Sequence, residues 1–204
     1  MIILIAVIAA FLLYLLITSV RNARTMGKLT FCLPGKPEKK AYLIEKENRI
    51  DIQTGFRCSG FASAFVLRHF GQNVTGDEAY EKMPCKTEDG CVYPKGIVQL
   101  MDMYGLKCTF CRGGLNSLKR EICKGNPVIV FIRLHHVKQM LHFVPVVGYD
   151  EEYIYFAESW ADRVNCDMPH YNRRVPVKEF MTLWRIGDWG MPLYSCTYFT
   201  VSKK

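Results

Sequence analysis

The 204-residue chain lacks the sequence features of several protein classes. It has no internal repeat and no low-complexity tract, which argues against a repeat architecture. It also has no zinc-finger or helix-turn-helix spacing and no basic stripe interleaved with aromatic residues, so no nucleic-acid partner is expected. Apolar residues make up 50% and charged residues 23% of the chain, which excludes a disordered or collagen-like protein and favours one packed domain.

The first twenty residues contain no charged side chain. A helix over residues 2–20 would be about 28 Å long, close to the thickness of the hydrocarbon core of a bilayer. A cleaved signal peptide is disfavoured, because no Lys or Arg precedes the apolar run and no good small-residue cleavage site follows it. Residues 1–20 are therefore predicted to form one transmembrane helix, with membrane lipid as its partner.

The charges that flank this span predict its orientation. The nearby basic residues all follow it, at Arg21, Arg24, Lys28, Lys36, Lys39 and Lys40. The positive-inside rule then predicts a single-pass protein of the cell membrane with its folded body in the cytoplasm, and much of the net charge of +8 would lie against anionic head groups. The nine cysteines favour the same reducing compartment, because an odd number cannot all pair.

The rest of the chain divides into a linker and a folded domain. Residues 21–48 show no sustained periodicity and are interpreted as a basic juxtamembrane linker, and the domain is expected over residues 49–204. Helical patterns lie at 58–70, 75–82 (with a capping box at its start), 95–104 and 117–124, and strand-like runs lie at 127–133, 141–149, 153–158 and 194–201. Because the helices precede the strands, the predicted class is α+β, with helices packed on an antiparallel sheet.

Cys58 is the strongest candidate for a reactive residue. It stands at the start of the predicted helix 58–70, where the helix dipole and unpaired N–H groups favour a thiolate. Gln53 lies five residues upstream, and its side-chain amide can donate to a developing oxyanion together with the backbone amide of Cys58.

His142 is the candidate base for this thiol. It begins the strand-like run 141–149, and the turn at residues 150–152 connects this run to 153–158. If the two runs pair as antiparallel strands, His142 lies opposite a residue between about 158 and 161. Glu158 falls at one edge of this window, where its carboxylate could orient the imidazole as the third member of a catalytic set.

Other candidates carry less weight. Trp160, next to Glu158, is expected to shield the site from water and to contact substrate. His136 lies in a polar turn and is interpreted as a rim contact for substrate, with a rival base as the alternative. Cys108 and Cys111 have the two-residue gap of a zinc knuckle, but they lie in a strand-like run, and Cys85 and Cys91 are spaced too widely to complete the set, so no metal site is predicted.

Three blocks of sequence carry a family resemblance. They are QTGFRCSG with a helix that ends in VLRHFG (residues 53–71), GNPVIV followed by HFVPVVGYD (125–130 and 142–150), and IYFAESW (154–160). In this order they resemble the papain-like, bacteriocin-processing peptidases that cut double-glycine leaders, and their stand-alone relatives. The resemblance extends over about residues 49–201.

This resemblance implies a papain-like fold with Cys58 as nucleophile, His142 as base and Gln53 as oxyanion donor, and no cofactor. Two positions depart from the family pattern, because Ser59 replaces the usual Gly and Glu158-Ser159 replaces an Asp that is often followed by Pro. The expected function is a membrane-anchored cysteine peptidase that cleaves a peptide or protein substrate through a thioester. A transamidase or deamidase on the same fold, and a non-catalytic peptide-binding module, are the alternatives.

Overall fold

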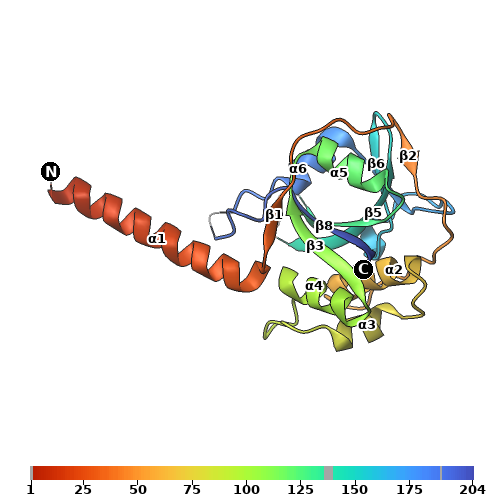
Figure 1. Ribbon diagram of the computed structural model, residues 1–204, viewed down its shortest axis with the longest axis horizontal. Helices are drawn as coiled ribbons and strands as arrows, with labels where there is room; N and C mark the ends of the chain where they lie inside the picture. Colours follow the sequence, from red (N-terminus) through yellow and green to blue (C-terminus); the bar gives the residue numbers. More distant parts are fainter. Residues whose placement is uncertain (1, 136–139, 189) are drawn as a thin grey trace.

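A long N-terminal helix, α1 (Ile2–Met26), projects from an α+β domain (Figure 1). The computed structural model describes residues 2–135, 140–188 and 190–204. Within these residues, α1 is the one helix long and apolar enough to cross a membrane. It continues six residues beyond the predicted span, and its last turns contact the domain, where Met26 enters the core.

The sheet follows the order β1-β3-β8-β4-β5-β6-β7, with β2 paired to β5. All of these strand pairs are antiparallel except β1 with β3. The strands are β1 (Leu29–Phe31), β2 (Tyr42–Leu43), β3 (Leu106–Arg112), β4 (Val128–Arg133), β5 (Leu141–Tyr149), β6 (Tyr153–Phe156), β7 (Arg173–Pro176) and β8 (Thr197–Lys203). Residues 21–48 thus add two short strands to the sheet, although they were interpreted as a linker.

Helices cover both faces of the sheet (Figure 1). One face carries α2 (Cys58–His69), α3 (Gly76–Lys82) and α4 (Pro94–Met103), and the other carries α5 (Leu115–Ile122) and α6 (Val177–Trp184); a short 3₁₀ helix, η1 (Ala161–Arg163), follows β6. Strand β4 separates two apolar cores, because Ile129 and Phe131 pack on one side while Val130 and Ile132 pack on the other. The predicted α+β class with an antiparallel sheet is confirmed.

The helix that begins with Cys58 is held rigidly. Its residues from Ser59 to Leu67 are buried, and it packs against α3 and across β5. Gly60 marks the closest approach to α3, because a Cβ atom there would lie 2.5 Å from the backbone oxygen of Gly76. The start of α3 has the predicted capping box, in which Thr75 and Glu78 each accept a hydrogen bond from the other's backbone N–H.

Candidate active site

Cys58 is the first residue of α2 and is half-buried in the wall of a cavity of about 200 Å³. No side chain caps the start of this helix, so its N-terminal N–H groups are directed toward the region of the thiol. This end of a helix favours negative charge, because it carries the positive end of the helix dipole. Cys58 therefore stands at the positive end of this helix.

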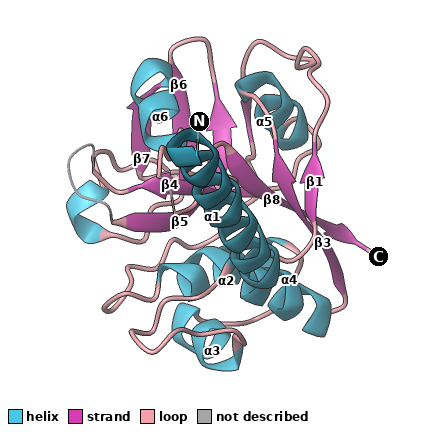
Figure 2. Ribbon diagram, turned by 90° about the vertical axis from the view of Figure 1, so that its left-hand side faces the viewer, coloured by secondary structure: helices cyan, strands magenta, loops and turns pink. Residues whose placement is uncertain are grey.

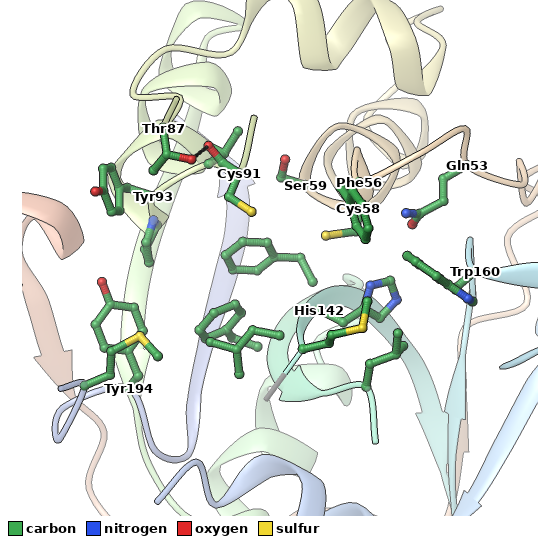
Figure 3. A pocket seen from close by; sticks show the side chains of 18 residues that line it. Gln53, Phe56, Cys58, Ser59, Thr87, Cys91, Tyr93, His142, Trp160 and Tyr194 are labelled. Carbon is green, nitrogen blue, oxygen red and sulfur yellow. Dashed lines mark hydrogen bonds between the residues drawn. The ribbon is translucent and has the colours of Figure 1, made fainter. Parts of the chain in front are cut away.

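His142 and Glu158 form a buried hydrogen-bonded pair beside this thiol. The distance from His142 Nε2 to Glu158 Oε1 is 2.7 Å, and the two side chains are 1% and 0% exposed. Cys58 and His142 line the same cavity, and the nearby thiol contributes to raising the pKa of His142. Because Nε2 faces Glu158, the remaining ring nitrogen, Nδ1, is the one available to the thiol. Figure 3 shows Cys58, His142 and Gln53 around one end of the cavity.

Glu158 lies next to His142, as expected, but regular pairing of β5 with β6 does not by itself bring the two residues together. Strand β6 ends at Phe156, and a register shift between Val146 and Gly148 interrupts its pairing with β5. The chain then continues beside β5 through a hydrogen bond from the Ala157 amide to the Pro145 carbonyl. Glu158 consequently reaches His142 from just beyond the end of the strand.

Three further residues bind the Glu158 carboxylate and backbone. Arg173 Nη1 lies 2.7 Å from Glu158 Oε2, and the Trp160 amide donates to Oε1 at 2.8 Å. The side-chain amide of Asn172 donates to the Glu158 carbonyl and accepts from its backbone N–H, at 2.9 and 2.7 Å. Arg173 and Asn172 were missed by the sequence analysis, because their role depends on the pairing of β7 with β6.

These contacts determine the charges of the buried pair. Burial lowers the pKa of His142, but the charge of Glu158 and hydrogen bonds with Cys58 and Glu158 outweigh it, so this pKa lies well above its ordinary value. Burial raises the pKa of Glu158, but the charge and hydrogen bond of His142 and the charge of Arg173 hold it well below the usual range. The pair is therefore an imidazolium and a carboxylate at neutral pH.

Gln53 is fixed by Ser159, the residue after Glu158. The backbone N–H of Gln53 donates to the Ser159 carbonyl at 2.8 Å, and the Ser159 hydroxyl donates to the side-chain oxygen Gln53 Oε1 at 2.7 Å. Gln53 Nε2 donates to the Gly55 carbonyl at 2.7 Å. The side chain lines the same cavity as Cys58 and His142 (Figure 3). Because Glu158 binds His142, the structure brings together Cys58, His142, Glu158 and Gln53.

The other predicted site residues have different outcomes. Trp160 lines the cavity, with its ring edge-to-face with His142 at 6.3 Å between centroids and tilted against Phe56 at 5.9 Å. His136 lies outside the described residues. All nine cysteines are free, and the described part of the chain contains no cluster of three or more His, Cys, Asp or Glu that could hold a metal ion.

A comparison with protein families matches residues 45–186 to the peptidase C39-like family. The chain belongs to this family. A comparison with curated protein sequences gives no match. The matched region of this C39-like protein includes Gln53, Cys58, His142 and Glu158.

Solved structures show the same fold. The chain is similar to a C39-like peptidase from Bacillus anthracis, with 16% identity, a TM-score of 0.59 and coverage of 79% of this chain and 98% of the other. It is also similar to the double-glycine-motif protease of an AMS/PCAT transporter, solved with a leader peptide (15%, TM-score 0.56, 79% and 98% covered). A third similar structure is the Carica candamarcensis cysteine protease CMS1MS2 bound to E-64 (15%, TM-score 0.54, 81% and 99% covered). The predicted papain-like fold is confirmed.

Proposed function

We propose that this C39-like protein is a membrane-anchored cysteine peptidase that cleaves a peptide bond through a thioester intermediate. One observation carries the proposal: Cys58, at the start of α2, and His142 line one cavity, and the buried Glu158 carboxylate holds His142 through a hydrogen bond of 2.7 Å. A nucleophile, a base and a residue that orients the base are the three parts that thiol acyl transfer requires. The leader-peptide complex of a similar protease supports a peptide as the substrate.

In the proposed reaction the proton of the Cys58 thiol is held by His142 at Nδ1, and the thiolate attacks the carbonyl carbon of the scissile bond. The tetrahedral intermediate collapses when His142 protonates the leaving amine, and the acyl group remains on sulfur as a thioester. Water then attacks the thioester with His142 as base. This last step releases the new carboxylate and restores the thiol.

Gln53 is proposed to stabilise the oxyanion together with the backbone N–H of Cys58. An amide nitrogen carries two hydrogens, and Gln53 Nε2 donates one of them to Gly55. The second is available to an oxygen in the cavity. Ser159 holds the other end of the amide, which prevents the side chain from flipping its oxygen toward the oxyanion.

Glu158 is proposed to take the role that Asp has in the family pattern. The additional methylene of Glu would displace the carboxylate by more than an ångström if the backbone were in the same place. Here the carboxylate contacts His142 directly at 2.7 Å, and it also binds Arg173 and the backbone N–H of Trp160. The acid therefore meets the geometric requirement for orienting the imidazole.

We further propose that α1 crosses the membrane and that the domain lies in the cytoplasm. Residues 3–17 of α1 are exposed to the surroundings and apolar, and the first charged residue of the chain is Arg21. Basic residues follow on the domain side only. Cysteine accessibility to a membrane-impermeant maleimide in intact cells tests this orientation, and labelling of the domain from outside the cell would contradict it.

Alkylation of Cys58 by iodoacetamide tests the catalytic pair. The purified full chain in detergent is treated at pH 7, and each cysteine is followed by peptide mass mapping. We expect rapid labelling of Cys58 that His142→Ala slows by about 100-fold, because the variant lacks the group that holds the thiol proton. Cys91, which lines the same cavity, serves as the internal control. Equal rates in wild type and His142→Ala would instead favour a non-catalytic peptide-binding module.

Digestion of a peptide library tests the reaction itself. The wild-type chain should produce new termini that Cys58→Ala does not produce. In water labelled with oxygen-18 the label should enter the new carboxyl groups, because water is the acceptor of the acyl group. Amine adducts, or Gln side chains converted to Glu without chain cleavage, would identify a transamidase or a deamidase.

A further inference from the structure

Helix α1 is connected directly to the wall of the candidate active site. Tyr194 lines the cavity with its ring, and its hydroxyl oxygen lies 2.9 Å from Thr25 Oγ1 at the end of α1. Arg21 Nη2 donates to the Gly190 carbonyl at 2.7 Å, in the same loop as Met191, another lining residue. The anchor and the cavity therefore share one loop, between α6 and β8.

The end of α1 is fixed in orientation as well as in position. Thr18, Asn22 and Met26 lie four residues apart on one stripe of the helix and are 5%, 2% and 2% exposed, whereas the helix before Thr18 is exposed. In Figure 2 the C-terminal end of α1 lies beside α4, which it contacts. The domain is thus docked on its anchor at a defined angle.

The docking places the cavity near the bilayer surface. The first charged residue after the apolar run is Arg21, which marks the boundary between hydrocarbon and head groups. Thr25 is one helical turn further, about 6 Å along the helix axis. The loop that contains Gly190, Met191 and Tyr194 is consequently at head-group level, and Figure 1 places it on the side of the domain from which α1 projects.

The cavity is chemically suited to a segment that leaves a membrane. None of its described lining residues is Asp, Glu, Lys or Arg. The walls between Tyr194 and Cys58 are apolar and aromatic, formed by Val92, Pro94, Phe131, Leu134, Leu141 and Phe143. A charged or strongly hydrated chain would lose hydration there without gaining a partner, whereas an apolar chain gains about 25 cal/mol per Å² buried.

We propose that the substrate is a polypeptide anchored in the same membrane, and that the bond cut by Cys58 lies at the bilayer surface, within a few residues of the anchor of that substrate. This inference rests on the proposed peptidase function and adds the position of the substrate. The rigid contact of α1 with Tyr194 and Gly190 fixes the distance from the bilayer to the thiol, so the enzyme would select substrates by how far the scissile bond stands from the membrane.

A series of membrane-anchored probes measures this distance. Each probe is a Leu-rich single-span peptide that carries a chloroacetamide after a Gly-Ser spacer, and it is reconstituted with the full chain in phosphatidylcholine vesicles. Spacers of about 3, 6, 12 and 24 residues reach about 10 to 80 Å. The readout is the rate of Cys58 modification, with the same spacers lacking the span as soluble controls.

We expect the rate to peak at one of the two shortest spacers and to fall at least about tenfold by the longest, as effective concentration requires when the reach exceeds the distance. The double variant Arg21→Ala with Thr25→Val keeps the anchor but removes both polar contacts of α1 with the loop. It should broaden this optimum while the soluble probes modify Cys58 at the wild-type rate.

Two results would overturn the inference. If the anchored probes react at the same rate at all spacer lengths, or only at the longest, the site does not face the nearby membrane surface. The peptidase proposal survives this result provided that soluble iodoacetamide still modifies Cys58 in a manner that depends on His142. If that dependence is also absent, the peptidase proposal fails first and the inference fails with it.

Discussion

Arg173 and Glu158 form an ion pair in the interior of the domain, with 2.7 Å between Nη1 and Oε2 and side chains that are 5% and 0% exposed. His142 occupies the other carboxylate oxygen. A carboxylate that is removed from water requires compensating charge and hydrogen bonds, because burial alone would favour its protonated form. Arg173 is thus a positioning residue for the proposed catalytic acid, and it acts through Glu158 rather than on substrate.

Replacing Arg173 with Met tests this role. The change keeps the length of the side chain but leaves Glu158 with one buried cation fewer, so we expect a loss of about 3–5 kcal/mol in the free energy of unfolding. It should also raise the pKa of Glu158 and slow the alkylation of Cys58. Denaturant titration of the full chain in detergent and the alkylation rate are the measurements.

The neighbouring residue Arg174 provides the matched control. Its side chain is exposed on the same strand and lies over the ring of Tyr153. Arg174→Met should cost no more than about 1 kcal/mol, which is the range of exposed charge interactions. If the two substitutions have equal effects on stability and alkylation, the ion pair with Glu158 has no special role.

The opposite pKa shifts of His142 and Glu158 predict a stability optimum in pH. Glu158 has a folded-state pKa below its ordinary value of 4.5, so its contribution is present above pH 4.5 and is lost as the pH falls toward about 2. His142 has a folded-state pKa above 6.5, so its contribution is present below pH 6.5 and is lost as the pH rises toward about 10. Both contributions to stability are therefore fully present between pH 4.5 and pH 6.5.

Glu158→Gln tests the origin of this profile. The amide keeps most of the shape but cannot become charged, so the acid limb should flatten and the pKa of His142 should fall toward its ordinary value. We expect unfolding free energies measured from pH 3 to pH 9 to lose most of their alkaline dependence between pH 7 and pH 9. A variant that keeps the wild-type profile would show that other groups produce it.

The sequence was informative where a local pattern determines the structure. The helix with Cys58, the capping box at Thr75 and the strand with His142 were all predicted, because periodicity and caps are properties of adjacent residues. The antiparallel pairing of β5 with β6 was also predicted, and it placed Glu158 within a few residues of His142, but the register shift that completes their contact was not. Cys58, His142 and Glu158 could therefore be proposed from the sequence alone.

The rest depends on contacts that no local pattern records. Strand β7 buries Arg173 and Val175 on one face. Sequence alone would place an Arg on the surface, so the burial of Arg173 could not be predicted. Helix α6 was also missed, since no side chain caps its start and it directly follows Pro176 at the end of β7. Strands β1 and β2 contain three and two residues, and their pairing depends on partners far along the chain. Strand β7 holds the acid through Arg173, so this support of the site was a part that sequence did not reveal.

A substitution at Ser159 tests the proposed oxyanion site independently of the reactivity of the Cys58 thiol. Ser159→Ala removes the hydroxyl that holds Gln53 Oε1 and should leave alkylation by iodoacetamide within about twofold, since alkylation forms no oxyanion. Hydrolysis of a peptide found in the library should fall by about 10- to 100-fold, with Gln53→Ala as the reference variant. A parallel loss of alkylation and hydrolysis would mean that Ser159 supports the whole site instead.

Gly60 provides a final test of how firmly α2 holds Cys58. A Cβ at this position would lie 2.5 Å from both the Gly76 carbonyl oxygen and the Cβ of Tyr80, and the backbone of α3 cannot yield as a flexible side chain would. Gly60→Ala should therefore cost about 1–3 kcal/mol of unfolding free energy and slow alkylation of Cys58. Gly114→Ala is the matched control, because nothing lies within 4 Å of its added methyl group. If Gly60→Ala proved as harmless as the control, α2 and α3 would have room to separate, and the thiol would not be held in place by their packing.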